Sequence, residues 1–194
     1  MNDLIWFSVP GAILLVAISI SVPAILPSDG TVLIGLAPIV GFIVHQSLRV
    51  IFESLGGWHF KAREVVSVIS NTYQLANRKD AFLVWELAFY SDNIPAPFRD
   101  HDRGAWHYIL SFSSCCFAAF LGGILVALVP PQVSRMLHLE TVAFFVLGGL
   151  FLVKAFLTFR SLNGQEVAFF LMYRDDFNKA HGALLPMVEP APPN

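Results

Sequence analysis

Five polar residues lie in or beside apolar runs that are long enough to cross a membrane. Four of them lie at or just after the end of the second run, and the fifth lies in the last run, GGLFLVKAFLTFR: His45, Gln46, Arg49, Glu53 and Lys154. Ionisable side chains are costly in hydrocarbon and normally face a bundle interior, a subunit interface or water. His45, Arg49 and Glu53 recur at every fourth position, so a helix would place them on one face. We therefore treat these five residues as candidates for a pore lining or polar seam.

Three of these candidates also have a simpler interpretation. Arg49 and Glu53 would lie in water if the second run ends at Leu48, and Lys154 would be unremarkable if the last run ends early. However, Lys154 precedes Arg160 by about 9 Å of helix, and its side chain leans toward the helix N-terminus, which is predicted to lie outside. To reach cytoplasmic water it would have to snorkel against that lean. Both interpretations stay open at this level.

A second polar group precedes the third apolar run. Asp100, His101, Asp102 and His107 are weak candidates for a metal site or hydrolytic chemistry, because carboxylates and imidazoles are metal ligands. The alternative is a solvated loop that leads into a helix.

No cofactor is predicted. A haem b held by His45 and His107 is not favoured, because the two histidines would differ in depth by roughly 6 Å and no further motif supports it. The only cysteines, Cys115 and Cys116, are adjacent, and the chain has no glycine-rich phosphate loop, G-x-S-x-G or H-E-x-x-H motif.

Composition and the length of the apolar runs predict the helices that carry these residues. The chain has 194 residues, of which 56% are hydrophobic and 13% charged, against roughly 25% charged in soluble domains. Four runs reach the roughly 20 residues that a helix needs to span a bilayer: 4–26, 31–48, 105–129 and 141–159. Their continuous apolarity excludes the alternating pattern of a β-barrel. The sequence thus predicts an all-α membrane protein with four transmembrane helices.

The positive charges predict the orientation of these spans. Of the 12 Lys and Arg residues, ten lie within the middle segment, just before it or after the last run, whereas Arg135 is on the opposite side and Lys154 within a span. Positive charge favours the cytoplasmic side. We therefore expect both termini in the cytoplasm and the protein in the plasma (inner) membrane of a prokaryote.

The resulting organisation has five parts. They are a first transmembrane hairpin (1–52), a cytoplasmic helical segment (53–104), a second hairpin (105–160), a cytoplasmic or interfacial helix (161–181) and a disordered Pro-rich tail (182–194). Within the middle segment we predict a helix around 61–80, a second helix with Asp80 as its N-cap, and a loop over 91–104. The adjacent glycines Gly122 and Gly123, and Gly148 and Gly149, predict close helix packing.

The two halves share this order, which raises the possibility of a parallel internal repeat with a two-fold axis along the membrane normal. A shift of 107 residues gives seven identities in 36 positions and aligns Lys154 with Ser47. Shared architecture without duplication explains the same pattern.

Three functions from different classes follow from these patterns. The first is a homo-oligomeric channel, pore or membrane effector with a cytoplasmic helical collar. The second is a non-catalytic accessory or scaffold subunit of a larger membrane complex, and the third is a membrane-surface enzyme that uses the His101 loop. The predicted partners are the lipid bilayer and further copies or other membrane subunits. A net charge of -2 gives no basic excess for nucleic acid.

Overall fold

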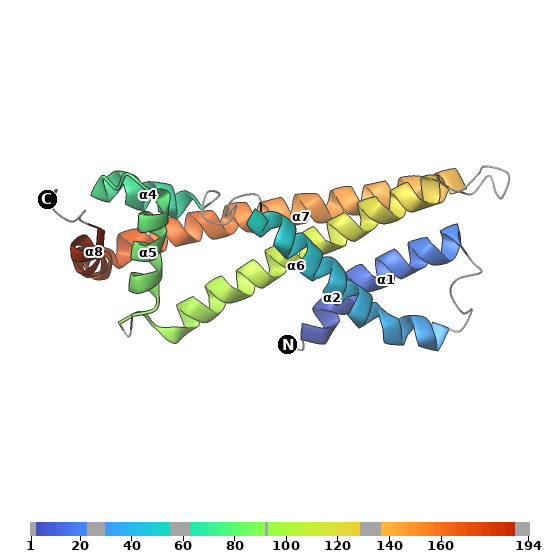
Figure 1. Ribbon diagram of the computed structural model, residues 1–194, viewed down its shortest axis with the longest axis horizontal. Helices are drawn as coiled ribbons and strands as arrows, with labels where there is room; N and C mark the ends of the chain where they lie inside the picture. The colour runs from blue at the N-terminus through green and yellow to red at the C-terminus, as the bar shows by residue number, and fades with distance from the viewer. Residues whose placement is uncertain (1–2, 23–29, 55–62, 92, 129–136, 189–194) are drawn as a thin grey trace, which may run out of the picture. The chain divides into compact units, whose positions relative to one another are not determined.

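The computed structural model is all helical over the residues that it describes, which are 3–22, 30–54, 63–91, 93–128 and 137–188. These residues form seven helices and no strand (Figure 1). The chain divides into two compact units, which we call unit 1 (Met1–Ile51 and Trp106–Thr158) and unit 2 (Phe52–Ala105 and Phe159–Asn194). The prediction of an all-α protein is confirmed.

In unit 1, the backbones of α1 (Asp3–Ser21) and α2 (Gly30–Ser54) are in direct contact where the helices cross. A Cβ atom at Gly11 would collide with the carbonyl of Ala37, and one at Gly41 would collide with the carbonyl of Phe7. Small residues allow such close approach between apolar helices. The crossing therefore depends on glycine at both positions.

Unit 1 also contains the C-terminal part of α6 (Ala96–Ala127) and the N-terminal part of α7 (Leu137–Met172). The two helices run side by side here, with Gly148 against the ring of Phe120 and Gly123 against the ring of Phe145 (Figure 1). Gly122 meets Ala17 of α1 and Phe144 of α7. The predicted packing role is confirmed for these three glycines, whereas Gly149 has open space around it.

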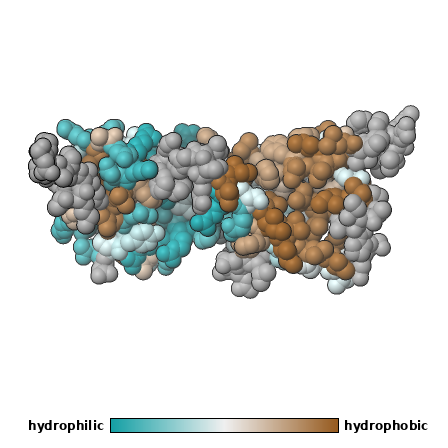
Figure 2. All heavy atoms as spheres, viewed as in Figure 1, coloured by the Kyte–Doolittle hydropathy of each residue, from teal (hydrophilic) through white to brown (hydrophobic). Residues whose placement is uncertain are grey.

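Three helical stretches are long and apolar enough to cross a membrane: Gly30–Ile51, Ala96–Ala127 and Leu139–Met172. The apolar part of α1, Trp6–Ser21, is shorter. Large apolar side chains remain exposed on these helices, and apolar residues gather over unit 1 (Figure 2). Membrane insertion is therefore compatible with the structure, while a fourth span and an internal repeat stay predictions.

Unit 2 is built around a core of aromatic rings. Its helices are α4 (Glu64–Tyr73), α5 (Arg78–Phe89), α8 (Arg174–Val188) and the parts of α6 and α7 that lie outside unit 1. Trp85, Phe170 and Phe177 are at most 1% exposed. Trp85 stacks on Phe89 with ring centroids 5.0 Å apart, and Phe169 packs edge-on against both, at 6.0 and 5.3 Å. Each buried ring contributes roughly 1.5–3 kcal/mol. This packing holds together helices that are too short to be stable alone.

Two helix starts differ from the sequence prediction. The N-cap of α5 is Asn77, whose side chain accepts a hydrogen bond from the N–H of Lys79 at 2.9 Å, so Asp80 lies within the first turn. Helix α6 begins at Ala96, inside the predicted loop over 91–104. Pro97 is tolerated there because the first-turn N–H groups of a helix have no intrahelical partner.

The later helix boundaries also differ. Helix α7 continues without a break from Leu137 to Met172, although we expected a span to end near 160. Gly164 has only a modest propensity cost within such a long helix. Helix α8 extends to Val188, beyond residue 182 where the predicted tail begins. The segments that join the two predicted spans of each hairpin (27–30 and 130–140) lie largely outside the described residues, and the last six residues lie wholly outside them.

Candidate functional site

His45 binds a serine of a neighbouring helix within unit 1. Its Nδ1 lies 3.1 Å from Oγ of Ser114, and that hydroxyl donates to the carbonyl of Leu110 at 2.8 Å. A serine hydroxyl has one proton, so the arrangement requires His45 to donate through Nδ1. The ring of His45 also lies edge-on to Phe7, with centroids 5.2 Å apart. His45 therefore joins α2 to α6.

The other candidates on α2 have different environments. Gln46 is half-buried and Arg49 is exposed. Glu53 is part of α2, but its side chain lies outside the described residues. A shared polar face thus stays a prediction for Arg49 and Glu53.

Lys154 lies on an exposed apolar face of α7, far from either end of the helix. On this face Leu150, Val153 and Leu157 are 63%, 56% and 54% exposed. The four predicted spans contain neither Asp nor Glu. Within this chain, the spans therefore provide no carboxylate to neutralise Lys154.

A buried charged cluster occurs in unit 2. Nη2 of Arg63 lies 3.4 Å from Oε1 of Glu166 and 3.6 Å from Oδ2 of Asp102. The side chains of Arg63, Asp102 and Glu166 are 10%, 13% and 2% exposed. The guanidinium also lies over the rings of Phe82 and Trp85, at 5.7 and 5.8 Å from their centroids. Pairing of this kind is what makes buried charge tolerable.

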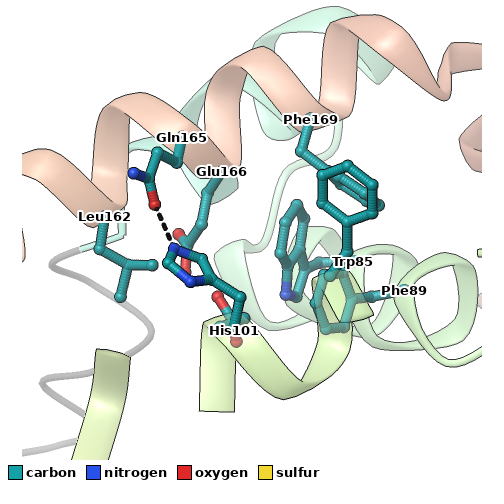
Figure 3. A pocket seen from close by; sticks show the side chains of 9 residues that line it. Trp85, Phe89, His101, Leu162, Gln165, Glu166 and Phe169 are labelled. Atoms are coloured by element: carbon teal, nitrogen blue, oxygen red, sulfur yellow. Dashed lines mark hydrogen bonds between the residues drawn. The ribbon is translucent and has the colours of Figure 1, made fainter. Parts of the chain in front are cut away.

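A small cavity lies beside the charged cluster, with a volume of about 30 Å³. Its lining combines aromatic rings with polar side chains: Trp85, Phe89, Phe98, His101, Asp102, Leu162, Gln165, Glu166 and Phe169. Figure 3 shows side chains of α7 facing His101 of α6 and the rings of α5 across this space. Both acidic residues of the cluster are among the lining residues, whereas Arg63 is not.

One carboxylate oxygen of the charged cluster lacks a hydrogen-bond donor among the described residues. Oδ1 of Asp102 is buried and has no hydrogen-bond partner among the described residues. A buried acceptor without a donor costs about 1–3 kcal/mol. The cavity is large enough for a water molecule or a small polar group.

The polar residues predicted to form a loop lie instead on the first turns of α6. There Nε2 of His101 donates to Oε1 of Gln165 at 2.9 Å, and Asp102 belongs to the charged cluster (Figure 3). Asp100 and His107 are exposed. Among the described residues, no group of three or more His, Cys, Asp or Glu side chains is placed to hold a metal ion.

Arg63, Glu166 and the aromatic residues that line the cavity were not predicted from the sequence. Glu166 does carry a signal, since it is a single acid next to the apolar run VAFFLM, as Lys154 is a single base in its own run. Nothing in the sequence pairs it with Arg63, because that contact joins segments that are distant in the chain.

No model of a known protein family matches the chain, and neither does any curated protein or solved structure.

Proposed function

We propose that the protein is a four-span integral membrane protein that self-associates through the exposed face of α7 and conducts anions along the seam that contains Lys154. Its cytoplasmic unit 2 would form the collar of this assembly. The observation that carries the proposal is the position of Lys154 within an exposed apolar face of a long helix.

The exposed face of α7 combines apolar side chains with the charge of Lys154, and this combination limits what it can contact. The apolar side chains around Lys154 favour lipid or another protein surface over water. A lysine that faces lipid costs about 2.5–3.5 kcal/mol on insertion scales, and considerably more in simulations. A face shared between copies satisfies both requirements, because the apolar residues pack against the neighbour while the ammonium reaches a hydrated seam.

The charge of that seam determines the permeant class. The predicted spans contain no carboxylate, and Lys154 is repeated in each copy of the assembly. Rings of lysine or arginine select anions, as rings of acids select cations. The proposed pore is therefore selective for small anions such as chloride.

Chloride flux in liposomes tests this proposal. We expect Lys154→Leu to reduce flux about tenfold or more, and Lys154→Arg to retain most of it, because the arginine keeps the charge of the seam. Val142→Leu, also exposed on α7, is the matched control and should conduct normally. Flux that is unchanged in Lys154→Leu would remove the basis of the proposal.

The lack of carboxylates in the spans also favours a second candidate, an accessory subunit. Here Lys154 pairs with a carboxylate of a different membrane protein, since another copy of this chain offers none in its predicted spans. Purification from native membranes in mild detergent separates the two candidates. A stable complex with another membrane protein, lost in Lys154→Leu and kept in Lys154→Arg, supports the subunit, whereas a single-component oligomer contradicts it.

A further inference from the structure

Basic side chains gather in unit 1 where α2 crosses α6 (Figure 1). The hydrogen bond between His45 and Ser114 joins the two helices there. Arg49 follows His45 by one helical turn, and His107 precedes Ser114 by two turns, so both lie on the helix faces that carry this hydrogen bond. Arg49 and His107 also act electrostatically on His45, which places the three side chains near one another. We call His45, Arg49 and His107 the basic cluster.

Two members of the basic cluster can be reached by a ligand. Arg49 and His107 are exposed, whereas His45 is half-buried and bonded to Ser114. A guanidinium has five N–H donors and an imidazole has at least one, so both can bind an anion while they keep other contacts. Positive charges that lie together repel, and an anion between them relieves this repulsion. Because the planar fork of arginine matches phosphate oxygens, the basic cluster fits a phosphate group.

Aromatic and apolar side chains beside the basic cluster suit a membrane lipid. Tyr108 is 39% exposed, and its ring lies edge-on to that of Trp6 on α1, with centroids 4.8 Å apart. Trp and Tyr are enriched where a membrane meets water. Phe42 precedes Arg49 by two turns on the same face of α2, deeper in the predicted span, and is 48% exposed. A lipid whose phosphate binds Arg49 would therefore find an apolar surface for its acyl chains.

We propose that the basic cluster binds the phosphate of an anionic phospholipid from the cytoplasmic leaflet. The distribution of Lys and Arg predicts that this end of unit 1 faces the cytoplasm, and the cytoplasmic leaflet is the one with negative surface charge. Arg49 and His107 hold the phosphate, and Phe42 contacts an acyl chain. The net negative charge distinguishes this lipid from a zwitterionic one, and the chains distinguish it from a free phosphate ion.

Native mass spectrometry of the full-length protein in detergent tests this inference with two lipids that have the same acyl chains. We expect phosphatidylglycerol to bind about fivefold or more tightly than phosphatidylcholine, which is the usual gain from one basic residue at a membrane surface. Equal binding of the two lipids would overturn the inference.

Glycerol phosphate tests the source of the phosphate in the same measurement. In about tenfold excess it should leave phosphatidylglycerol bound, because it lacks the acyl chains that contribute apolar contact. Displacement of the lipid would show a site for free anions and would overturn the assignment to a lipid.

Variants test the residues of the basic cluster through the ratio of the two lipid affinities, which a general loss of folding would not change selectively. Arg49→Gln should lower the preference for phosphatidylglycerol about fivefold, and Arg49→Lys should retain most of it. Arg160→Gln removes the same charge from an exposed position of unit 2, so it is the matched control and should keep the preference. An equal loss in Arg160→Gln would show attraction by overall charge only, and would contradict the site.

The result is separable from that of the proposed function. Lys154→Leu should keep the preference for phosphatidylglycerol, because Lys154 lies on α7 and not in the basic cluster. A protein that prefers phosphatidylglycerol but does not conduct chloride contradicts only the proposed function. A protein that conducts chloride but binds both lipids equally contradicts only the lipid site.

Discussion

Unit 1 and unit 2 differ in what they bury. Unit 1 brings its helices together through glycines and a His45–Ser114 hydrogen bond, and it leaves many large apolar side chains exposed. Unit 2 encloses aromatic rings, and its visible surface is largely hydrophilic (Figure 2). Burial of apolar side chains drives folding in water, whereas helices in lipid associate through close packing and hydrogen bonds. The packing of unit 2 is thus typical of a protein core formed in water, and the packing of unit 1 is compatible with a membrane.

Trp85→Ala tests the rule for unit 2 and should have the largest effect on stability. Trp85 is 1% exposed and contacts Phe89, Phe169 and Phe177. Its removal should cost about 3–5 kcal/mol of unfolding free energy, through lost burial and the void left behind. Hydrogen exchange should show lost amide protection in α4, α5 and α8, with protection in α1 retained.

Leu87→Ala is the matched control on the same helix. Leu87 is 51% exposed, so its truncation should change stability by no more than about 0.5 kcal/mol. If Trp85→Ala lowered protection equally in both units, the units would not be separate in stability, and the comparison would fail.

Gly41→Ala tests the rule for unit 1 with a single methyl group. The new Cβ would collide with the carbonyl of Phe7, so α1 and α2 must separate. We expect a loss of about 1–3 kcal/mol, the usual cost of overpacking, measured by thermal unfolding in detergent. Gly35→Ala on the same helix is the control, because nothing lies within 4 Å of its added Cβ. Equal stability of the two variants would contradict the close crossing.

The sequence predicted the elements of unit 1 better than those of unit 2. Long apolar runs specify helices directly, and the adjacent glycines indicated a packing surface between α6 and α7. The close crossing of α1 and α2 at Gly11 and Gly41 was not predicted, because it depends on where the two helices meet.

The site of unit 2 was less predictable. Asp102 was a candidate because of its neighbours in sequence, yet its partners in space are Arg63 and Glu166. The start of α6 at Ala96 was not predicted either, because a proline usually ends a helix. Pro97 is tolerated here because it lies in the first turn. Contacts between distant segments depend on packing, and periodicity describes only the local chain.

Tyr73 offers the smallest and most specific test, because it titrates within unit 2. Its hydroxyl donates to Oδ1 of Asn178 at 2.8 Å, and its ring stacks on His181. Burial raises the pKa of Tyr73 above its ordinary value, and the positive charge of Arg174 opposes that rise in part. Since the folded pKa exceeds the unfolded one, the stabilisation is complete below about pH 10 and is lost as pH rises through the folded pKa.

Tyr73→Phe should therefore be less stable than the wild type at neutral pH, by no more than about 1 kcal/mol for one hydrogen bond, and the difference should shrink above pH 10. Denaturant unfolding of unit 2, followed by hydrogen exchange at a series of pH values, measures both the stability difference at neutral pH and its decrease above pH 10. Tyr90→Phe, which alters a side chain that is 54% exposed, should leave the alkaline loss in place. If the difference between Tyr73→Phe and the wild type stayed constant with pH, the pKa of Tyr73 would not be raised in the folded protein, which would contradict a buried hydroxyl that donates to Asn178.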